Sequence, residues 1–265
     1  FCNRSSSNEY YIEDRGFDIP EIRILIDAVN AASFITPKKT VELVGKVAAL
    51  GGSHRGEIMK SETKIYNTTK HSNEYIYYSI NEIELAITQK KKVSFYYFDY
   101  NEKKEKVFRK GKKRYYINLY AMLISNDNYY LIGYNDFYKN FLHFRIDRMT
   151  ETRISHYDIV ESEEIDEFDL AKHYRQLFGM YSGDEETVKL SFDKSLIDVV
   201  IDKFGESVEL TPQSVGSVET EVDVQVSPQF IAWVNSFGNK MKVTSPKKVV
   251  DKIKSALQSA LEQYE

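Results

Sequence analysis

The stretch from Lys112 to Arg153 constrains the fold of this 265-residue chain more than any other part of it. Tyrosine, phenylalanine, isoleucine and leucine dominate the stretch, and Asn and Asp interrupt it at residues 126–128 and 135–136. Aromatic and branched side chains favour strands, whereas Asn and Asp favour the turns between them. The pattern therefore predicts a meander of three strands, at 115–125, 129–134 and 141–153.

The last of these strands alternates apolar and charged side chains, which is typical of a half-buried strand. The alternation places His143, Arg145 and Asp147 on one face and Phe144 and Ile146 on the core face. Such a pattern most often indicates a strand with a solvated face. We therefore expect the guanidinium of Arg145 to be free to meet a ligand.

Arg148 falls on the core side of the same strand, close to its end. From there its side chain can bend over the rim or pair with a carboxylate.

The composition is that of a globular chain, 42% hydrophobic and 29% charged, and its length suits two or three units. Its apolar runs fall short of the roughly 20 residues needed to span a bilayer. The single cysteine, Cys2, excludes an internal disulfide framework and fits a reducing cytoplasm. The five histidines complete no metal-ligand spacing, so we expect no metal, and we expect no other cofactor. Because no apolar run could span a bilayer, we also expect no membrane partner.

The net charge of -4 hides a strong asymmetry along the chain. Residues 90–114 hold eleven Lys or Arg against three Asp or Glu, with tyrosine and phenylalanine between them. Positive charge binds phosphate and aromatic rings stack on bases, so nucleic-acid backbone contacts are candidates for Lys110, Lys112, Lys113 and Arg114. The alternative is a charged hairpin that only keeps the chain soluble.

Helices are predicted before and after the meander. Apolar residues recur at three and four positions after Asp18 and again after Thr36-Pro37, and the second helix stops at Gly51-Gly52. A third helix at 74–89 leads into a strand at 93–100. The first two helices form a hairpin that packs either on its own domain or on a second copy of the chain.

The composition changes after Arg153, where residues 161–167 form an acidic segment followed by a short helix within 168–180. Strands and helices then interleave to the end of the chain, which suggests a ferredoxin-like α+β sandwich. We expect strands at 188–192, 208–210, 218–226 and 241–243, and helices at 195–204, 228–237 and 246–263.

Two motifs in the meander resemble those of the WYL domain. The segment 129–134 places Tyr129 in the Trp position and matches at Tyr130 and Leu131, and the arginine-bearing strand follows at the expected spacing. The segment 118–122 resembles Ser-Pro-Tyr-Ala-Leu, with Tyr120 and Ala121 matching outright. The resemblance implies a small Sm-like or SH3-like β-barrel that binds a regulatory ligand. A barrel this small has no interior room, so binding must use an outer face or rim.

The resemblance extends beyond the barrel. Residues near 20–60 resemble the dimerising helical linker of WYL transcriptional regulators, and 230–238 with 243–246 resemble their C-terminal extension. Residues 10–17 resemble the exit from the wing of a winged helix-turn-helix domain. We expect the rest of that domain to be missing from this chain, and we expect any duplex DNA to be bound through that domain. The expected segments are a wing remnant (1–17), a dimerisation linker (18–72), the barrel (73–156), an acidic linker with a short helix (157–186) and a ferredoxin-like extension (187–265).

An enzyme is not expected, because the chain has no Gly-x-Ser-x-Gly elbow, no Walker loop and no Gly-rich fingerprint after a strand. The leading hypothesis is the sensor and homodimerisation region of a transcriptional regulator. An anionic effector, a nucleotide or an oligonucleotide, would bind Tyr120, Tyr130, His143, Arg145 and Arg148. The alternatives are a direct single-stranded nucleic-acid-binding module and an architectural dimer without a ligand, in which the arginines pair with carboxylates of their own fold such as Asp147.

Overall fold

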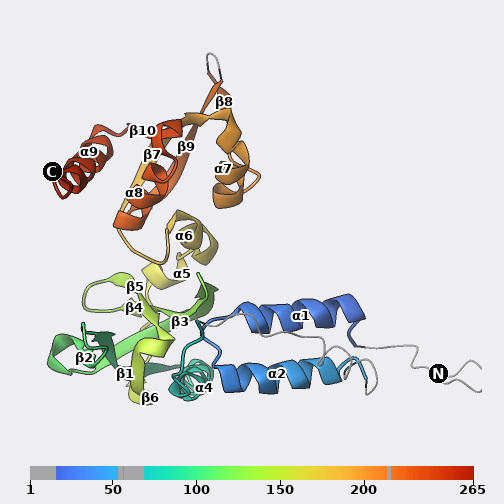
Figure 1. Ribbon diagram of the computed structural model, residues 1–265. Coiled ribbons are helices and arrows are strands. Elements are labelled where there is room, and N and C mark those ends of the chain that lie inside the picture. Colours follow the sequence, from blue (N-terminus) through green and yellow to red (C-terminus); the bar gives the residue numbers. More distant parts are fainter. Residues whose placement is uncertain (1–15, 53–55, 57–68, 214–215) are drawn as a thin grey trace, which may run out of the picture. The chain divides into compact units, whose positions relative to one another are not determined.

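The structure is a computed structural model that describes residues 16–52, 56, 69–213 and 216–265. The chain divides into two compact units, residues 1–160 and residues 161–265 (Figure 1). The expected wing remnant lies outside the described residues, except for its last two positions.

The first unit begins with a hairpin of two helices, α1 (Ile19–Ala31) and α2 (Pro37–Ala49), which lie side by side (Figure 1). Both starts agree with the sequence analysis: the Glu21 carboxylate accepts the Asp18 N–H at 2.7 Å, and the Thr36 hydroxyl accepts the Lys39 N–H at 3.2 Å. Apolar side chains from both helices form a small core between them, made by Ile22, Ile26, Val44 and Ala48.

A six-stranded antiparallel sheet follows and curls into a half-barrel, with helix α4 (Tyr75–Thr88) packed against it. Its strands are β1 (Lys91–Tyr100), β2 (Lys106–Phe108), β3 (Tyr115–Ser125), β4 (Asn128–Asn135), β5 (Asn140–Arg145) and β6 (Met149–Asp158). The order is β2-β1-β3-β4-β5, and β6 also pairs with β1. The buried centre is formed by Phe95, Ile117, Leu131, Phe144 and Ile146.

The meander is confirmed, but the prediction of one continuous strand from 141 to 153 is wrong. A 3-10 turn, η2 (Ile146–Arg148), separates β5 from β6. Ile146 stays in the core, as the alternation predicts, whereas Asp147 is buried instead of facing solvent. The turn ends the alternation because the carboxylate of Asp147 finds cationic partners inside the fold.

The second unit holds the acidic segment and two short helices, α5 (Glu163–Asp166) and α6 (Leu170–Gln176). The ammonium group of Lys203 donates to the carbonyl oxygens of Leu177 at 2.7 Å and Arg175 at 3.1 Å. It thereby supplies hydrogen bonds to carbonyl groups at the C-terminal end of α6, which have no partner within the helix. Burial lowers the pKa of Lys203 to about 8.

The rest of the second unit is an antiparallel sheet of order β10-β7-β9-β8, the strand order of a ferredoxin-like sandwich. The strands are β7 (Asp184–Asp193), β8 (Thr211–Pro212), β9 (Ser217–Val226) and β10 (Met241–Ser245), and the helices are α7 (Ile197–Phe204), α8 (Pro228–Asn235) and α9 (Lys247–Leu261). The strand expected at 208–210 is wrong, because pairing with β9 begins only at Thr211.

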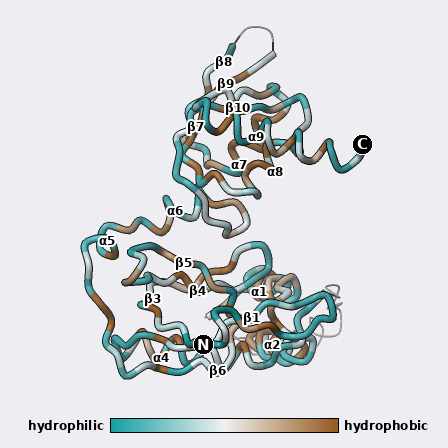
Figure 2. Tube along the Cα trace, turned by 90° about the vertical axis from the view of Figure 1, so that its left-hand side faces the viewer, coloured by the Kyte–Doolittle hydropathy of each residue, from teal (hydrophilic) through white to brown (hydrophobic). Residues whose placement is uncertain are grey.

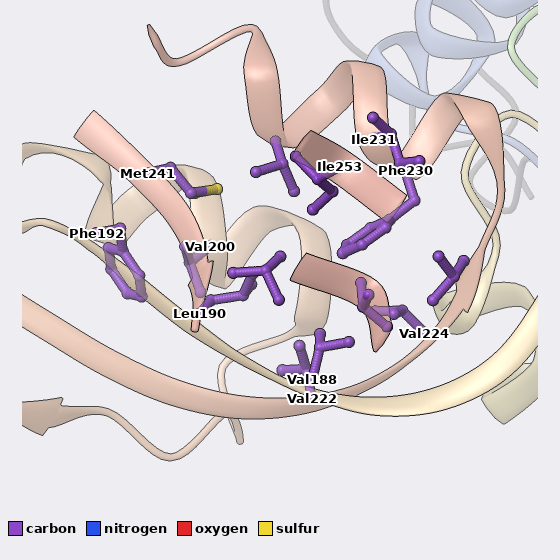
Figure 3. Packing of buried hydrophobic residues seen from close by; sticks show 14 of the residues in the cluster. Val188, Leu190, Phe192, Val200, Val222, Val224, Phe230, Ile231, Met241 and Ile253 are labelled. Carbon is purple, nitrogen blue, oxygen red and sulfur yellow. The ribbon is translucent and has the colours of Figure 1, made fainter. Parts of the chain in front are cut away.

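Alternate residues of these strands meet the helices in one core. Figure 3 shows Val188 and Leu190 of β7 and Val222 of β9 near Phe230 of α8 and Ile253 of α9. Along α9, hydrophobic residues recur among hydrophilic ones at the three- and four-residue spacing of an amphipathic helix (Figure 2).

Candidate anion-binding site on the half-barrel

The pairing of β4 with β5 sets the direction of the candidate side chains. Tyr130 lies opposite Arg145, and His143 lies two residues along on the same face, while Leu131 and Phe144 point to the core. The expectation that His143 and Arg145 share a face is confirmed. The structure therefore brings Tyr130, His143 and Arg145 together on one face of the sheet.

Tyr120 lies farther along the same sheet. It occupies a bulge of β3 between Leu119 and Ala121, and its ring packs edge-on against Phe141 at a centroid distance of 5.5 Å. A strand rises about 3.3 Å per residue, so Phe141 and Arg145 are separated by roughly 13 Å along β5. Tyr120 therefore does not join the arginine end of the site.

Arg145 is not free. Its Nε donates to Asp147 Oδ1 at 3.0 Å and a terminal nitrogen donates to Oδ2 at 2.9 Å, a bidentate pair. The Asp147 side chain is 4% exposed and that of Arg145 is 27% exposed. The expected free guanidinium is thus wrong, because the turn after β5 folds the carboxylate back onto the side chain two residues before it.

The charge of Arg145 is preserved in this setting. Partial burial lowers its pKa, but the hydrogen bonds and negative charge of Asp147 outweigh burial and raise the pKa above its usual value. The backbone N–H of Arg145 donates to the hydroxyl of Tyr97 at 3.1 Å, and burial raises the pKa of that hydroxyl. The tyrosine therefore remains neutral beside the ion pair.

Arg148 approaches the same carboxylate from another side. Its Nε lies 3.5 Å from Asp147 Oδ2, too far for a good hydrogen bond, and its guanidinium lies over the ring of Tyr100 at 4.4 Å. This buried Nε donates no hydrogen bond to any residue that the structure describes. Of the two positions open to Arg148 at the strand end, the structure shows the one that pairs with a carboxylate, and its Nε is left without a hydrogen bond to a described residue.

Two residues before α4 complete the surroundings of Asp147. His71 Nδ1 lies 3.0 Å from Asp147 Oδ2, and Asn73 donates to the Asp147 carbonyl oxygen at 2.9 Å. Two arginines and a histidine thus surround one carboxylate. The cluster has an excess of positive charge, which suits an anionic ligand.

The basic segment uses part of its charge within the fold. Arg114 donates to the carbonyl and the carboxylate of Glu151 at 3.0 and 3.2 Å, and its guanidinium lies over the ring of Tyr96 at 4.4 Å. Arg114, the residue before β3, therefore uses donors of its guanidinium within the fold, in contacts with β6 and β1.

The three candidate lysines are exposed. Lys110 lies over the ring of Tyr115 at 4.4 Å and Lys112 lies over Phe108 at 5.1 Å. These cation-π contacts leave the ammonium groups accessible to phosphate. The structure thus keeps Lys110, Lys112 and Lys113 as candidates for backbone contacts.

Four further residues belong to the site although no motif in the sequence marks them there: His71, Asn73, Tyr97 and Tyr100. Tyr97 and Tyr100 lie in a predicted strand. The pattern of a strand indicates which side chains share a face, but it does not indicate that Arg145 and Arg148 contact these two residues. His71 and Asn73 lie in a connecting segment without periodicity, and no local signal marks them.

Within the described parts of the chain, no three His, Cys, Asp or Glu side chains are arranged to hold a metal ion. No helix there has the length and apolar character needed to cross a membrane.

Comparison with known proteins identifies two domains. The WYL domain matches residues 79–154, and the WCX domain matches residues 184–261. No curated protein matches the sequence.

Two solved structures show distant similarity. Proteasome accessory factor B/C (PafBC) of Arthrobacter aurescens is 18% identical with a TM-score of 0.30, and the match covers 69% of this chain and 27% of that one. A CRISPR Cas-related protein is 15% identical with a TM-score of 0.45, covering 95% of this chain and 75% of the other. This chain thus spans about a quarter of the length of the first structure.

Proposed function

Because this chain is a WYL-domain protein that also carries a WCX domain, we propose that it is the effector-sensing and dimerisation region of a transcriptional regulator. The effector is anionic, a nucleotide or an oligonucleotide, and binds the half-barrel at Arg148 and Arg145 with Tyr100 and Tyr130 beside them. Duplex DNA would be bound through a winged helix-turn-helix domain.

One observation carries the proposal. Arg148 holds a buried Nε that donates no hydrogen bond to a described residue, next to a carboxylate already bound twice by Arg145. Leaving a buried donor without a hydrogen bond is unfavourable, and a phosphate oxygen that takes the place of the Asp147 carboxylate, 3.5 Å from this Nε, would satisfy it. The planar guanidinium also suits bidentate contact with phosphate while it lies on the Tyr100 ring.

The test measures by calorimetry the affinity of the chain for pyrophosphate and for a short 5′-phosphorylated oligothymidylate. Charge-assisted hydrogen bonds contribute about 1.5–3 kcal/mol, so Arg148→Ala should weaken binding about ten-fold or more. Arg148→Lys should recover only part of the loss, because a point charge cannot reproduce the planar fork.

Arg153→Ala is the matched control, because Arg153 is an exposed arginine whose recorded ion pair is with Glu151 at 4.0 Å. An equal loss in both variants would mean that general charge, and not this site, holds the probes. Mass spectrometry of whatever small molecule or nucleic acid co-purifies with the chain would identify the natural effector.

A direct single-stranded nucleic-acid-binding module is the second candidate, favoured by the exposed lysines of the basic segment. The two candidates differ in their response to salt. Affinity for an oligonucleotide that tracks Lys110, Lys112 and Lys113 falls steeply as salt rises, whereas affinity for a compact anion held by two arginines falls much less.

A further inference from the structure

The short segment of residues 70–74, the strap, touches the arginine cluster. His71 Nδ1 lies 3.0 Å from the Asp147 carboxylate, and Asn73 donates to the Asp147 carbonyl oxygen at 2.9 Å. A hydrogen on Nδ1 is present in the protonated ring and in one neutral tautomer, so the contact does not require a charged histidine. Asp147 is thus held by the strap as well as by the arginines.

The strap also holds the end of the α1–α2 hairpin. The backbone N–H of His71 donates to the carbonyl oxygen of Ser33 at 2.8 Å, and Lys70 donates to that of Ala32 at 2.7 Å. Glu74 accepts a hydrogen bond of 2.5 Å from the Thr36 hydroxyl, which caps α2. His71 therefore contacts the effector site through its side chain and the helical hairpin through its backbone.

Asp147 is the carboxylate at the centre of this cluster, and it occupies the Arg145 donors that an anionic effector would use. Its two carboxylate oxygens accept both hydrogen bonds from Arg145 and the contact from His71. An effector bound at Arg145 and Arg148 would bring a second negative charge next to a carboxylate that is 4% exposed. Like charges repel strongly in so poorly solvated a place, and a buried carboxylate that loses its partners is unfavourable.

We propose that Asp147 is an internal competitor for the effector and that its displacement loosens the His71 contact, which transmits effector binding to the α1–α2 hairpin. This inference rests on the effector site proposed above. Because coupling between two sites is reciprocal, weakening the His71–Asp147 contact also favours the effector-bound arrangement.

The first test measures pyrophosphate binding to the full chain carrying Asp147→Asn, with a thermal melt to confirm folding. Asparagine keeps the shape and removes the charge that competes with the anion. We expect affinity about ten-fold tighter than in the wild type, the effect of one charge-assisted contact. Affinity equal to or weaker than that of the wild type would overturn the competitor role.

The second test uses His71→Ala, which leaves both arginines paired with Asp147 and so remains informative if Asp147→Asn fails to fold. Hydrogen exchange is followed at residues 29–36 and 70–74 with and without pyrophosphate. In the wild type, pyrophosphate should speed exchange in both segments. In His71→Ala, pyrophosphate should bind at least as tightly but change exchange at 29–36 little.

His156→Ala is the matched control, because the His156 ring packs at a tilt against Tyr157 in the same unit, with a centroid distance of 3.9 Å. It should behave as the wild type in both measurements. A pyrophosphate-induced change at 29–36 that persists in His71→Ala would refute the transmission route.

The two proposals fail differently. If Arg148→Ala weakens binding but Asp147→Asn and His71→Ala change nothing, the effector site stands and the coupling does not. If neither the wild type nor Asp147→Asn binds pyrophosphate, the effector site itself is wrong.

Discussion

At the scale of single residues, Arg145 shows how one contact changes the role of a side chain. Alternation along β5 directs it away from the core, and the sequence therefore predicts a guanidinium that is free to meet a ligand. The structure instead gives it a bidentate bond to a buried carboxylate. In the folded chain Arg145 neutralises the charge of Asp147, and any contact between Arg145 and an effector must compete with the Arg145–Asp147 ion pair.

Arg145→Ala should therefore destabilise the first unit. Removing one partner of a buried ion pair costs about 3–5 kcal/mol, and we expect the lower end because Arg148 and His71 remain beside Asp147. Urea unfolding followed by tyrosine fluorescence measures the change, because the single tryptophan, Trp233, lies in the second unit. Arg145→Ala combined with Asp147→Asn should regain part of the loss, since no uncompensated charge is left. A single variant as stable as the wild type would show that the pair contributes little.

At the scale of elements, the α1–α2 hairpin buries one face of each helix and leaves other apolar side chains in solvent. Ile24 of α1 is 68% exposed and Val41 of α2 is 53% exposed, although Ile22 and Val44 are buried. Apolar side chains spread over the outside of a two-helix hairpin favour a further packing partner. We propose a second copy of the chain as that partner, in agreement with the dimerisation role expected from the family.

Light scattering tests the dimer. The wild type should be a homodimer at tens of micromolar, and Ile24→Glu should shift it toward the monomer without lowering helix content, because Ile24 lies outside the hairpin core. Ile87→Glu on α4, another exposed isoleucine, serves as the control. A monomeric wild type, or an unchanged dimer in Ile24→Glu, would argue against this interface.

At the scale of the whole molecule, the half-barrel and the ferredoxin-like sandwich have separate hydrophobic cores. Units with their own cores can unfold separately. We expect two calorimetric transitions, with Leu131→Ala lowering one and Phe230→Ala lowering the other. Each substitution removes a fully buried side chain and should cost about 2–5 kcal/mol within its own unit. One transition that moves equally with either substitution would contradict this independence.

The sequence by itself determined the strands and helices whose side chains have a regular period. The β3 boundaries, the core positions of Phe144 and Ile146, and the succession of strands and helices in the C-terminal sandwich follow from local pattern and turn chemistry, which act over a few residues. The motifs around Tyr120 and Tyr130 likewise indicated the WYL domain without a structure.

Only the tertiary structure decided which charges meet. Asp147 interrupts a predicted strand because Arg145, Arg148 and His71 converge on it, and His71 arrives from a segment more than seventy residues earlier in the chain. A contact between residues so far apart depends on how the elements pack, and no period in the sequence encodes it. The same packing ties the guanidinium of Arg145 to Asp147 and leaves the Nε of Arg148 without a hydrogen bond to a described residue, at the place where we propose that the effector binds.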